Sequence, residues 1–149
     1  MKNLYNQSDV EGIISRLEKL APDAERKWGK MSAAQMLAHL NANMETSMGI
    51  IFPKRAFMGR ILGRFIFNGY LKGKPLIKNA PTVKEYKIID ERDFEKERTK
   101  AIKLVKAFYE NGPEKCSDYP HPFFGKLSPE ECAILHWMHA DYHLGQFSS

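Results

Sequence analysis

Cysteine is scarce in this chain, which has only Cys116 and Cys132 among its 149 residues. Two cysteines outside a C-x-x-C pattern are too few for a disulfide framework, so we expect two reduced thiols in a cytoplasmic protein. Long apolar runs are missing too: no stretch of 18 apolar residues exists, and the first ten residues lack the apolar core of a signal peptide. The sequence therefore predicts neither a membrane span nor a secretory signal.

Acidic residues are absent from residues 51–80, although this segment contains seven basic ones. The rest of the chain has 16 basic and 18 acidic residues, a net charge of −2, so the overall charge of +5 comes from this one segment. The seven are Lys54, Arg55, Arg60, Arg64, Lys72, Lys74 and Lys78. With 43% hydrophobic and 28% charged residues, the composition is that of a globular protein, and the length fits one domain over residues 1–149.

Capping patterns and apolar periodicity predict four long helices. Three of them start at a serine with Glu or Gln three residues later, the pattern of a capping box. These serines are Ser8, Ser32 and Ser128. The other helix begins between Asp90 and Asp93 and ends before Gly112-Pro113, because glycine favours the end of a helix and proline forbids its continuation. A mainly helical domain follows from these signals.

About 40 residues separate the second and third of these helices, which is long for a compact helical protein. Its first part predicts an amphipathic helix with an apolar face opposite Arg60 and Arg64, and residues 75–89 are predicted to be extended. The apolar face consists of Phe57, Met58, Ile61, Leu62, Phe65 and Ile66. We expect this face to cover the other helices, with a solvated basic face outside. Binding of an anionic ligand, or of a membrane or nucleic-acid surface, is the alternative for residues 51–78, and nucleic acid is not expected as a partner.

Three histidines, His136, His139 and His143, fall within a 60° sector of the last predicted helix. The pair at i, i+4 places two imidazoles where one ion can bind both, and His39 is the only other histidine within a predicted helix. By spacing alone, core histidines that share hydrogen bonds with polar neighbours are the simpler interpretation. The polar residues near His39 favour a metal, since ligating histidines need hydrogen-bond acceptors. We expect those acceptors to be Gln35, Asn43 and Gln146.

Three motifs together resemble the DinB-like superfamily, and more narrowly one of its small uncharacterised bacterial branches. They are Trp28 to His39, His121-Pro122-Phe123-Phe124-Gly125 and His139 to Phe147, so the resemblance runs from residue 28 to the C-terminus. It implies a four-helix bundle with a long crossover after the second helix, and it suggests a homodimer. It also implies a divalent metal held by His39, His139 and His143. His136 matches no ligand position and is read as a neighbour or surface residue, while His121 is a packing residue or a substrate contact.

Three neutral imidazoles leave a divalent ion with its full charge and one open position. Such an ion lowers the pKa of bound water toward about 7, or holds a thiol as thiolate. No carboxylate is predicted as a general base, because Glu45 and Asp141 point away from the histidine sector by helical phase. The sequence therefore indicates a metal-binding protein, most concretely a metal-dependent hydrolase or a transferase with a thiol cosubstrate, as in some members of the superfamily.

Two matters stay open at this point. Three imidazoles suit several divalent ions, and Zn, Ni or Fe are the candidates. The alternative to an enzyme is a non-catalytic binding or stress-associated helical module, in which the histidines are structural.

Overall fold

The computed structural model describes residues 1–147, and within them it contains five α-helices and no β-strand. The helices are α1 (Gln7–Lys19), α2 (Ala33–Ser47), α3 (Phe57–Leu71), α4 (Phe94–Asn111) and α5 (Pro129–Gly145). Two short 3₁₀ helices, η1 (Lys84–Tyr86) and η2 (Pro113–Lys115), lie in the connections. The prediction of an all-helical fold is confirmed. Among the described residues, no helix has the length and apolar character needed to cross a membrane.

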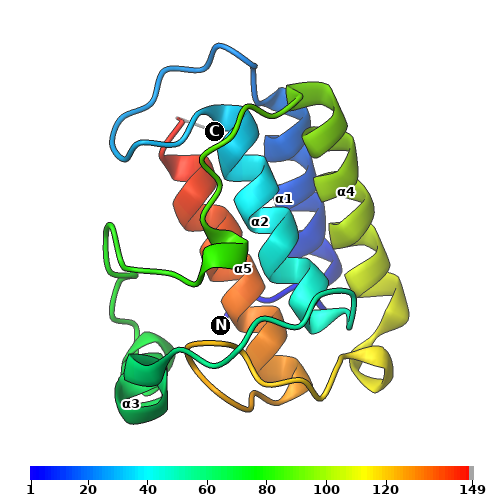
Figure 1. The fold of residues 1–149 in the computed structure, drawn as a ribbon. Helices are drawn as coiled ribbons and strands as arrows, with labels where there is room; N and C mark the ends of the chain where they lie inside the picture. Colours follow the sequence, from blue (N-terminus) through cyan, green and yellow to red (C-terminus); the bar gives the residue numbers. More distant parts are fainter. Residues whose placement is uncertain (148–149) are drawn as a thin grey trace.

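Four of the helices pack side by side, and α3 lies apart from them (Figure 1). Both α1 and α2 pack against α4 and α5, so that every helix of this group has two neighbours. Only Gln35 and Ala42 of α2 are partly exposed, and all its other residues are buried. The polar side chains of α2 therefore face other parts of the protein rather than water, and each needs a hydrogen-bond partner there.

The helix ends are set by local side chains. Both Ser32 and Ser128 form the predicted capping boxes, in which the serine hydroxyl accepts from the backbone three residues later. The α4 helix ends at Gly112, whose φ of 70° lies in the region that favours glycine. The predicted cap of the first helix is wrong: α1 begins at Gln7, and the Asn6 side chain accepts from the backbone N–H of Asp9. Asparagine caps a helix as well as serine does, and Asn6 comes two residues before Ser8.

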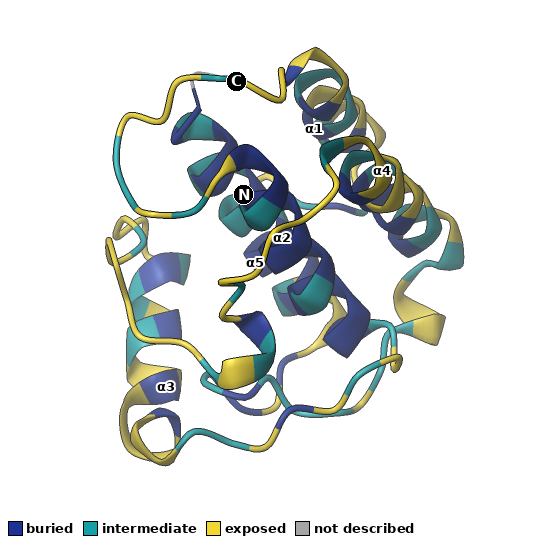
Figure 2. Ribbon diagram, turned by 45° about the horizontal axis from the view of Figure 1, so that its top comes forward, coloured by how far each residue is buried: buried dark blue, intermediate teal, exposed yellow. Residues whose placement is uncertain are grey.

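The amphipathic helix of the crossover exists as α3, but the expectation that its apolar face covers the other helices was wrong. The buried residues of α3 are Gly59, Gly63, Phe67 and Tyr70, which lie on its other side (Figure 2). This side packs on the loop of residues 121–125, where the Phe67 and Tyr70 rings contact Phe124. A Cβ at Gly63 would lie 2.0 Å from the carbonyl oxygen of Phe123, so the helix reaches the loop this closely only because these residues are glycines.

The second part of the crossover crosses the outside of α2. Residues 75–89 contain no strand, and within them η1 turns the chain so that the Tyr86 side chain is only 2% exposed. The Tyr86 hydroxyl lies 2.6 Å from the Thr46 hydroxyl on α2. This buried contact anchors the backbone of η1 beside the middle of α2, where His39 is located.

Candidate metal centre

Three imidazoles converge between α2 and α5. One ring nitrogen from each of His39, His139 and His143 lies within 4.8 Å of the other two. The Nε2 atoms of His39 and His139 are 3.0 Å apart, and the rings of His39 and His143 are 4.7 Å apart. His39 and His143 are buried, whereas His139 is partly exposed. The structure thus brings together the one histidine of α2 with two histidines of α5 that are separated by about one helical turn.

Hydrogen bonds fix the orientation of two of these rings. The Nδ1 atom of His39 donates to the backbone carbonyl of Tyr86 over 2.7 Å. The Nδ1 atom of His143 donates to Oε1 of Gln146, also over 2.7 Å. Because a neutral imidazole carries one proton, Nε2 of both rings is then unprotonated and has a lone pair that can bind a metal ion.

Gln146 is held by the segment that follows α1. The backbone N–H of Lys27 donates to the backbone carbonyl of Gln146 over 2.8 Å. A Cβ at Gly29 would lie 2.8 Å from Nε2 of Gln146, and Gly29 has a φ of 88°. Glycine suits this backbone conformation, and its lack of a side chain leaves room for the Gln146 amide that orients His143.

The other two predicted acceptors lie elsewhere. The side-chain oxygen of Gln35 accepts from the backbone N–H of Ser32 in the α2 cap, and its Nε2 donates to the Asp90 carbonyl over 3.0 Å. The Asn43 amide donates to the backbone carbonyl of His39 rather than to its ring. The acceptor for the His39 ring is the carbonyl of Tyr86, which sequence reasoning missed because a backbone oxygen has no side-chain signature.

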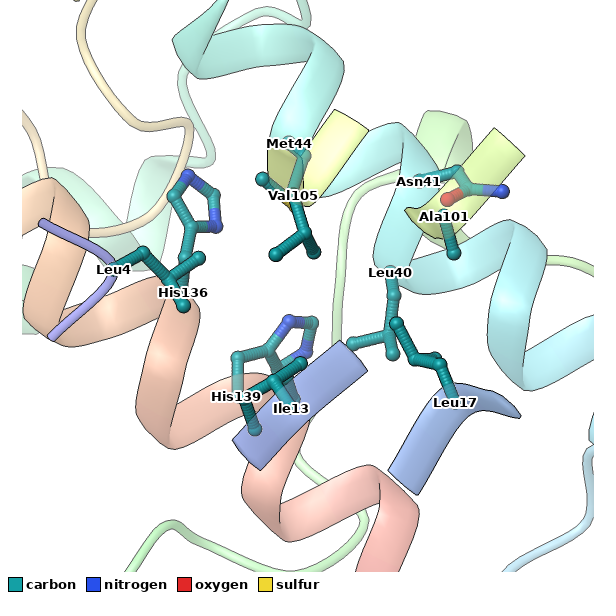
Figure 3. A pocket seen from close by; sticks show the side chains of 11 residues that line it. Leu4, Ile13, Leu17, Leu40, Asn41, Met44, Ala101, Val105, His136 and His139 are labelled. Atoms are coloured by element: carbon teal, nitrogen blue, oxygen red, sulfur yellow. The ribbon is translucent and has the colours of Figure 1, made fainter. Parts of the chain in front are cut away.

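The surroundings keep the imidazoles neutral. Burial lowers the pKa of His39, and burial followed by the neighbouring histidines lowers that of His139 well below its usual range. Burial also lowers the pKa of His143 to about 3. His139 and His136 line a small apolar cavity between α1, α2, α4 and α5, in which Asn41 is the only other polar side chain (Figure 3). Neutral imidazoles are the form that binds metals.

The sequence of the chain matches one protein family, described as "Protein of unknown function (DUF1569)", over residues 3–149. The chain belongs to this family. No curated protein and no solved structure matched it. The matched range of this DUF1569 protein contains His39, His139 and His143 together with Gln146 and Gly29.

The two remaining histidines of the DUF1569 protein are outside the cluster. His136 is buried rather than on the surface: its Nε2 lies 2.7 Å from the Ser47 hydroxyl, and its ring packs on Phe108. His121 accepts from the backbone N–H groups of Phe123 and Phe124 at Nδ1, so it shapes the loop that supports α3. Its ring also stacks on Phe124, which is the behaviour of a packing residue.

Two carboxylates on the same helices are paired elsewhere. Glu45 forms an ion pair with Lys100 of α4, and Asp141 forms one with Arg16 of α1 over 2.6 Å. Neither carboxylate is therefore directed at the histidines, in keeping with their helical phase. Cys116 and Cys132 are both free thiols.

His136 is expected to make the stability of the metal-free protein depend on pH. Burial lowers its pKa from 6.5 to about 4, so its contribution is fully present above pH 6.5 and is lost as the pH falls toward 4. The free energy of unfolding is measured by urea titration with chelator at pH 7 and at pH 4. It should fall between these two pH values in the wild type, and in His136→Gln this loss should be smaller by about 3 kcal/mol. Equal losses in the two proteins would show that His136 does not titrate in this way.

Proposed function

We propose that this DUF1569 protein binds a divalent metal ion at His39, His139 and His143, and that the ion serves a metal-dependent transferase or hydrolase reaction. One observation carries the proposal: hydrogen bonds to Tyr86 and Gln146 fix the protons of two buried rings on Nδ1, which leaves both Nε2 atoms unprotonated within a cluster of three histidines. Histidines that bind metals are held in this way by backbone or side-chain oxygens.

One pair of ring nitrogens is close to the spacing of two ligands on a single ion. Imidazole nitrogens bound tetrahedrally to an ion at about 2.0–2.1 Å lie about 3.3 Å apart, and Nε2 of His39 is 3.0 Å from Nε2 of His139. One nitrogen from each of the three rings lies within 4.8 Å of the other two, so a small inward movement of the rings would let all three bind one ion. The donor set, three neutral nitrogens without a carboxylate, is one that Zn, Ni and Fe accept. Three protein ligands also leave a position for a further ligand, as in catalytic rather than structural sites.

A bound divalent ion would supply a nucleophile at neutral pH by acidifying water or a thiol. On one side of the site, the chain has an apolar cavity next to His139. On the other side, the Trp28 indole donates to the Tyr142 hydroxyl, and the Tyr142 ring packs against His143. Lys78 lies 4.7 Å above the Trp28 ring, so a cation of the basic segment is near this aromatic pair. A thiol cosubstrate that carries carboxylates matches this charge.

The arrangement of the helices supports the same proposal. We infer that α1, α2, α4 and α5 form a DinB-like four-helix bundle and that residues 48–93 are its crossover, with α3 and η1 as its ordered parts. In such a bundle the ligands come from facing helices, as His39 does from α2 and His139 and His143 do from α5.

Replacement of Gln146 tests whether its hydrogen bond to His143 supports metal binding. Gln146→Leu removes the acceptor for Nδ1 of His143, so we expect the affinity for Zn²⁺ to fall by roughly 10–100-fold. The matched control is Gln35→Leu, which removes an amide from the α2 cap and should leave the affinity for Zn²⁺ unchanged. Competition with a chromogenic chelator measures both, and equal affinities for the two variants would contradict the proposed role of Gln146.

The same pair of variants tests whether the site is catalytic. Metal-loaded protein is assayed for hydrolysis of an activated ester and for transfer of a low-molecular-weight thiol to a chromogenic electrophile. Turnover in either assay should fall in Gln146→Leu and not in Gln35→Leu when both are measured below saturating Zn²⁺. Tight metal binding without turnover in any such assay would favour the non-catalytic alternative.

A further inference from the structure

An apolar face of α3 is exposed. It consists of Phe57, Met58, Ile61, Leu62 and Phe65, and we call it the α3 face. Phe57 and Phe65 are each 75% exposed and Ile61 is 62% exposed. Soluble proteins rarely present so many large apolar side chains next to one another, and such patches mark interaction surfaces.

Specific contacts on the opposite side of α3 keep the α3 face turned toward solvent. The opposite side of the helix is fixed on the loop of residues 121–125 through Gly59 and Gly63. The N–H of Ala56 donates to the Pro122 carbonyl over 2.8 Å, and Arg64 pairs with Glu131 at the start of α5 over 2.7 Å. Rolling the helix to bury the α3 face would put Cβ-bearing side chains where only glycine fits, so the apolar side chains stay on the surface.

Basic residues lie on one side of this face and at its C-terminal end. Arg60 is exposed and lies about 60° from Phe57 around the helix, and the exposed Lys72 follows the helix at its C-terminal end. Residues 51–80 include seven basic and no acidic residues, whereas the rest of the chain has a net charge of −2. A helix with a large apolar face and basic flanks is the pattern of a helix that lies in a membrane interface.

We propose that α3 binds the surface of a membrane that contains anionic phospholipids. Its phenylalanine, isoleucine, leucine and methionine side chains enter the boundary between headgroups and acyl chains, while Arg60 and Lys72 contact the phosphates. A second copy of the chain fits this face less well. Pairing two copies would bring together two α3 faces, each next to the exposed Arg60 and Lys72 and with no acidic residue in residues 51–80. The proposal does not depend on the metal site.

The test is co-sedimentation of the full chain with vesicles of phosphatidylcholine, with and without phosphatidylglycerol. We expect binding only with phosphatidylglycerol, and a decline in binding as salt rises from about 0.05 to about 0.5 M. Phe65→Ser should weaken binding by at least about tenfold. The matched control is Ile89→Ser, because Ile89 is 79% exposed but lies outside α3, and it should bind as the wild type does.

A second matched pair of variants tests the contribution of positive charge to vesicle binding. Arg60→Glu should weaken vesicle binding by roughly fivefold or more, whereas Lys106→Glu, on the exposed side of α4, should not change it. Because Phe65, Ile89, Arg60 and Lys106 are all exposed, the helical circular dichroism of each variant should match the wild type.

Three results would overturn the proposal. The first is absence of binding to vesicles with phosphatidylglycerol. The second is binding that Phe65→Ser leaves unchanged. The third is a dimer in vesicle-free solution that Phe65→Ser dissociates, which would assign the α3 face to a second copy of the chain.

Discussion

Replacement of His139 by alanine is expected to reduce the divalent ions bound per chain from one to nearly none. His139 is close to both other ligands: its Nε2 is 3.0 Å from that of His39, and its ring centroid is 4.5 Å from that of His143. Removing one of three nitrogen ligands should lower the affinity by at least about a hundredfold, more than loss of a supporting hydrogen bond does. Elemental analysis of protein purified without a metal-affinity column measures the content.

His136→Gln is the control for this change, since His136 lies on the same helix three residues earlier and has Ser47 as its partner. It should keep the wild-type metal content. Stability gives a second readout: Zn²⁺ at about 100 times its Kd should raise the free energy of unfolding by about 2.7 kcal/mol in the wild type and in His136→Gln. No such gain is expected in His139→Ala. Equal metal content in all three proteins would show that the histidines are structural.

Gly63→Ala is expected to destabilise the protein, although alanine favours helices over glycine by about 1 kcal/mol. The new Cβ would lie 2.0 Å from the carbonyl oxygen of Phe123, a backbone atom that cannot rotate away. Either α3 or the loop of residues 121–125 must move, at a cost of about 3 kcal/mol. The net effect is a loss of about 2 kcal/mol, measured by urea unfolding together with hydrogen exchange of the α3 amides.

Gly12→Ala is the matched control, because Gly12 is also inside a helix but a Cβ there meets nothing within 4 Å. It should stabilise the protein by about 0.5–1 kcal/mol through helix propensity alone. Opposite signs for the two glycine variants would support the packing of α3 on the loop. If both variants were stabilised to the same extent, that packing would be refuted.

Local signals in the sequence predicted most helix ends. Ser32, Ser128 and Gly112 act on groups within four residues of themselves, so their effect can be read without knowing the rest of the fold. The failure at the first helix has the same origin: Asn6 and Ser8 are both good caps, and nothing local decides between them.

The direction in which α3 faces could not be read in this way. Apolar periodicity locates a stripe on a helix, but it does not say which side the protein is on. The decisive residues, Gly59 and Gly63, carry no hydropathy signal and act by being small. Two glycines four residues apart, on the side opposite the apolar stripe, are the feature that indicates a close approach of another backbone.

The histidine cluster was predicted in part from spacing and in part from the resemblance. Spacing put His136, His139 and His143 on one face of a helix and left His39 as the only other histidine in a predicted helix, but the exclusion of His136 needed the resemblance or the fold. The contact between His39 and the Tyr86 carbonyl joins residues 47 positions apart in the sequence through a connection without a regular pattern. Such backbone contacts depend on the full course of the chain, so the sequence alone did not reveal them.

The most direct test of the metal centre is anomalous scattering from crystals of the protein, recorded on both sides of the absorption edge of the bound metal. We expect one peak per chain, located where Nε2 of His39 and His139 and the ring of His143 converge. Metal-loaded crystals without a peak at this point, or with the ion bound to other residues, would contradict the proposal.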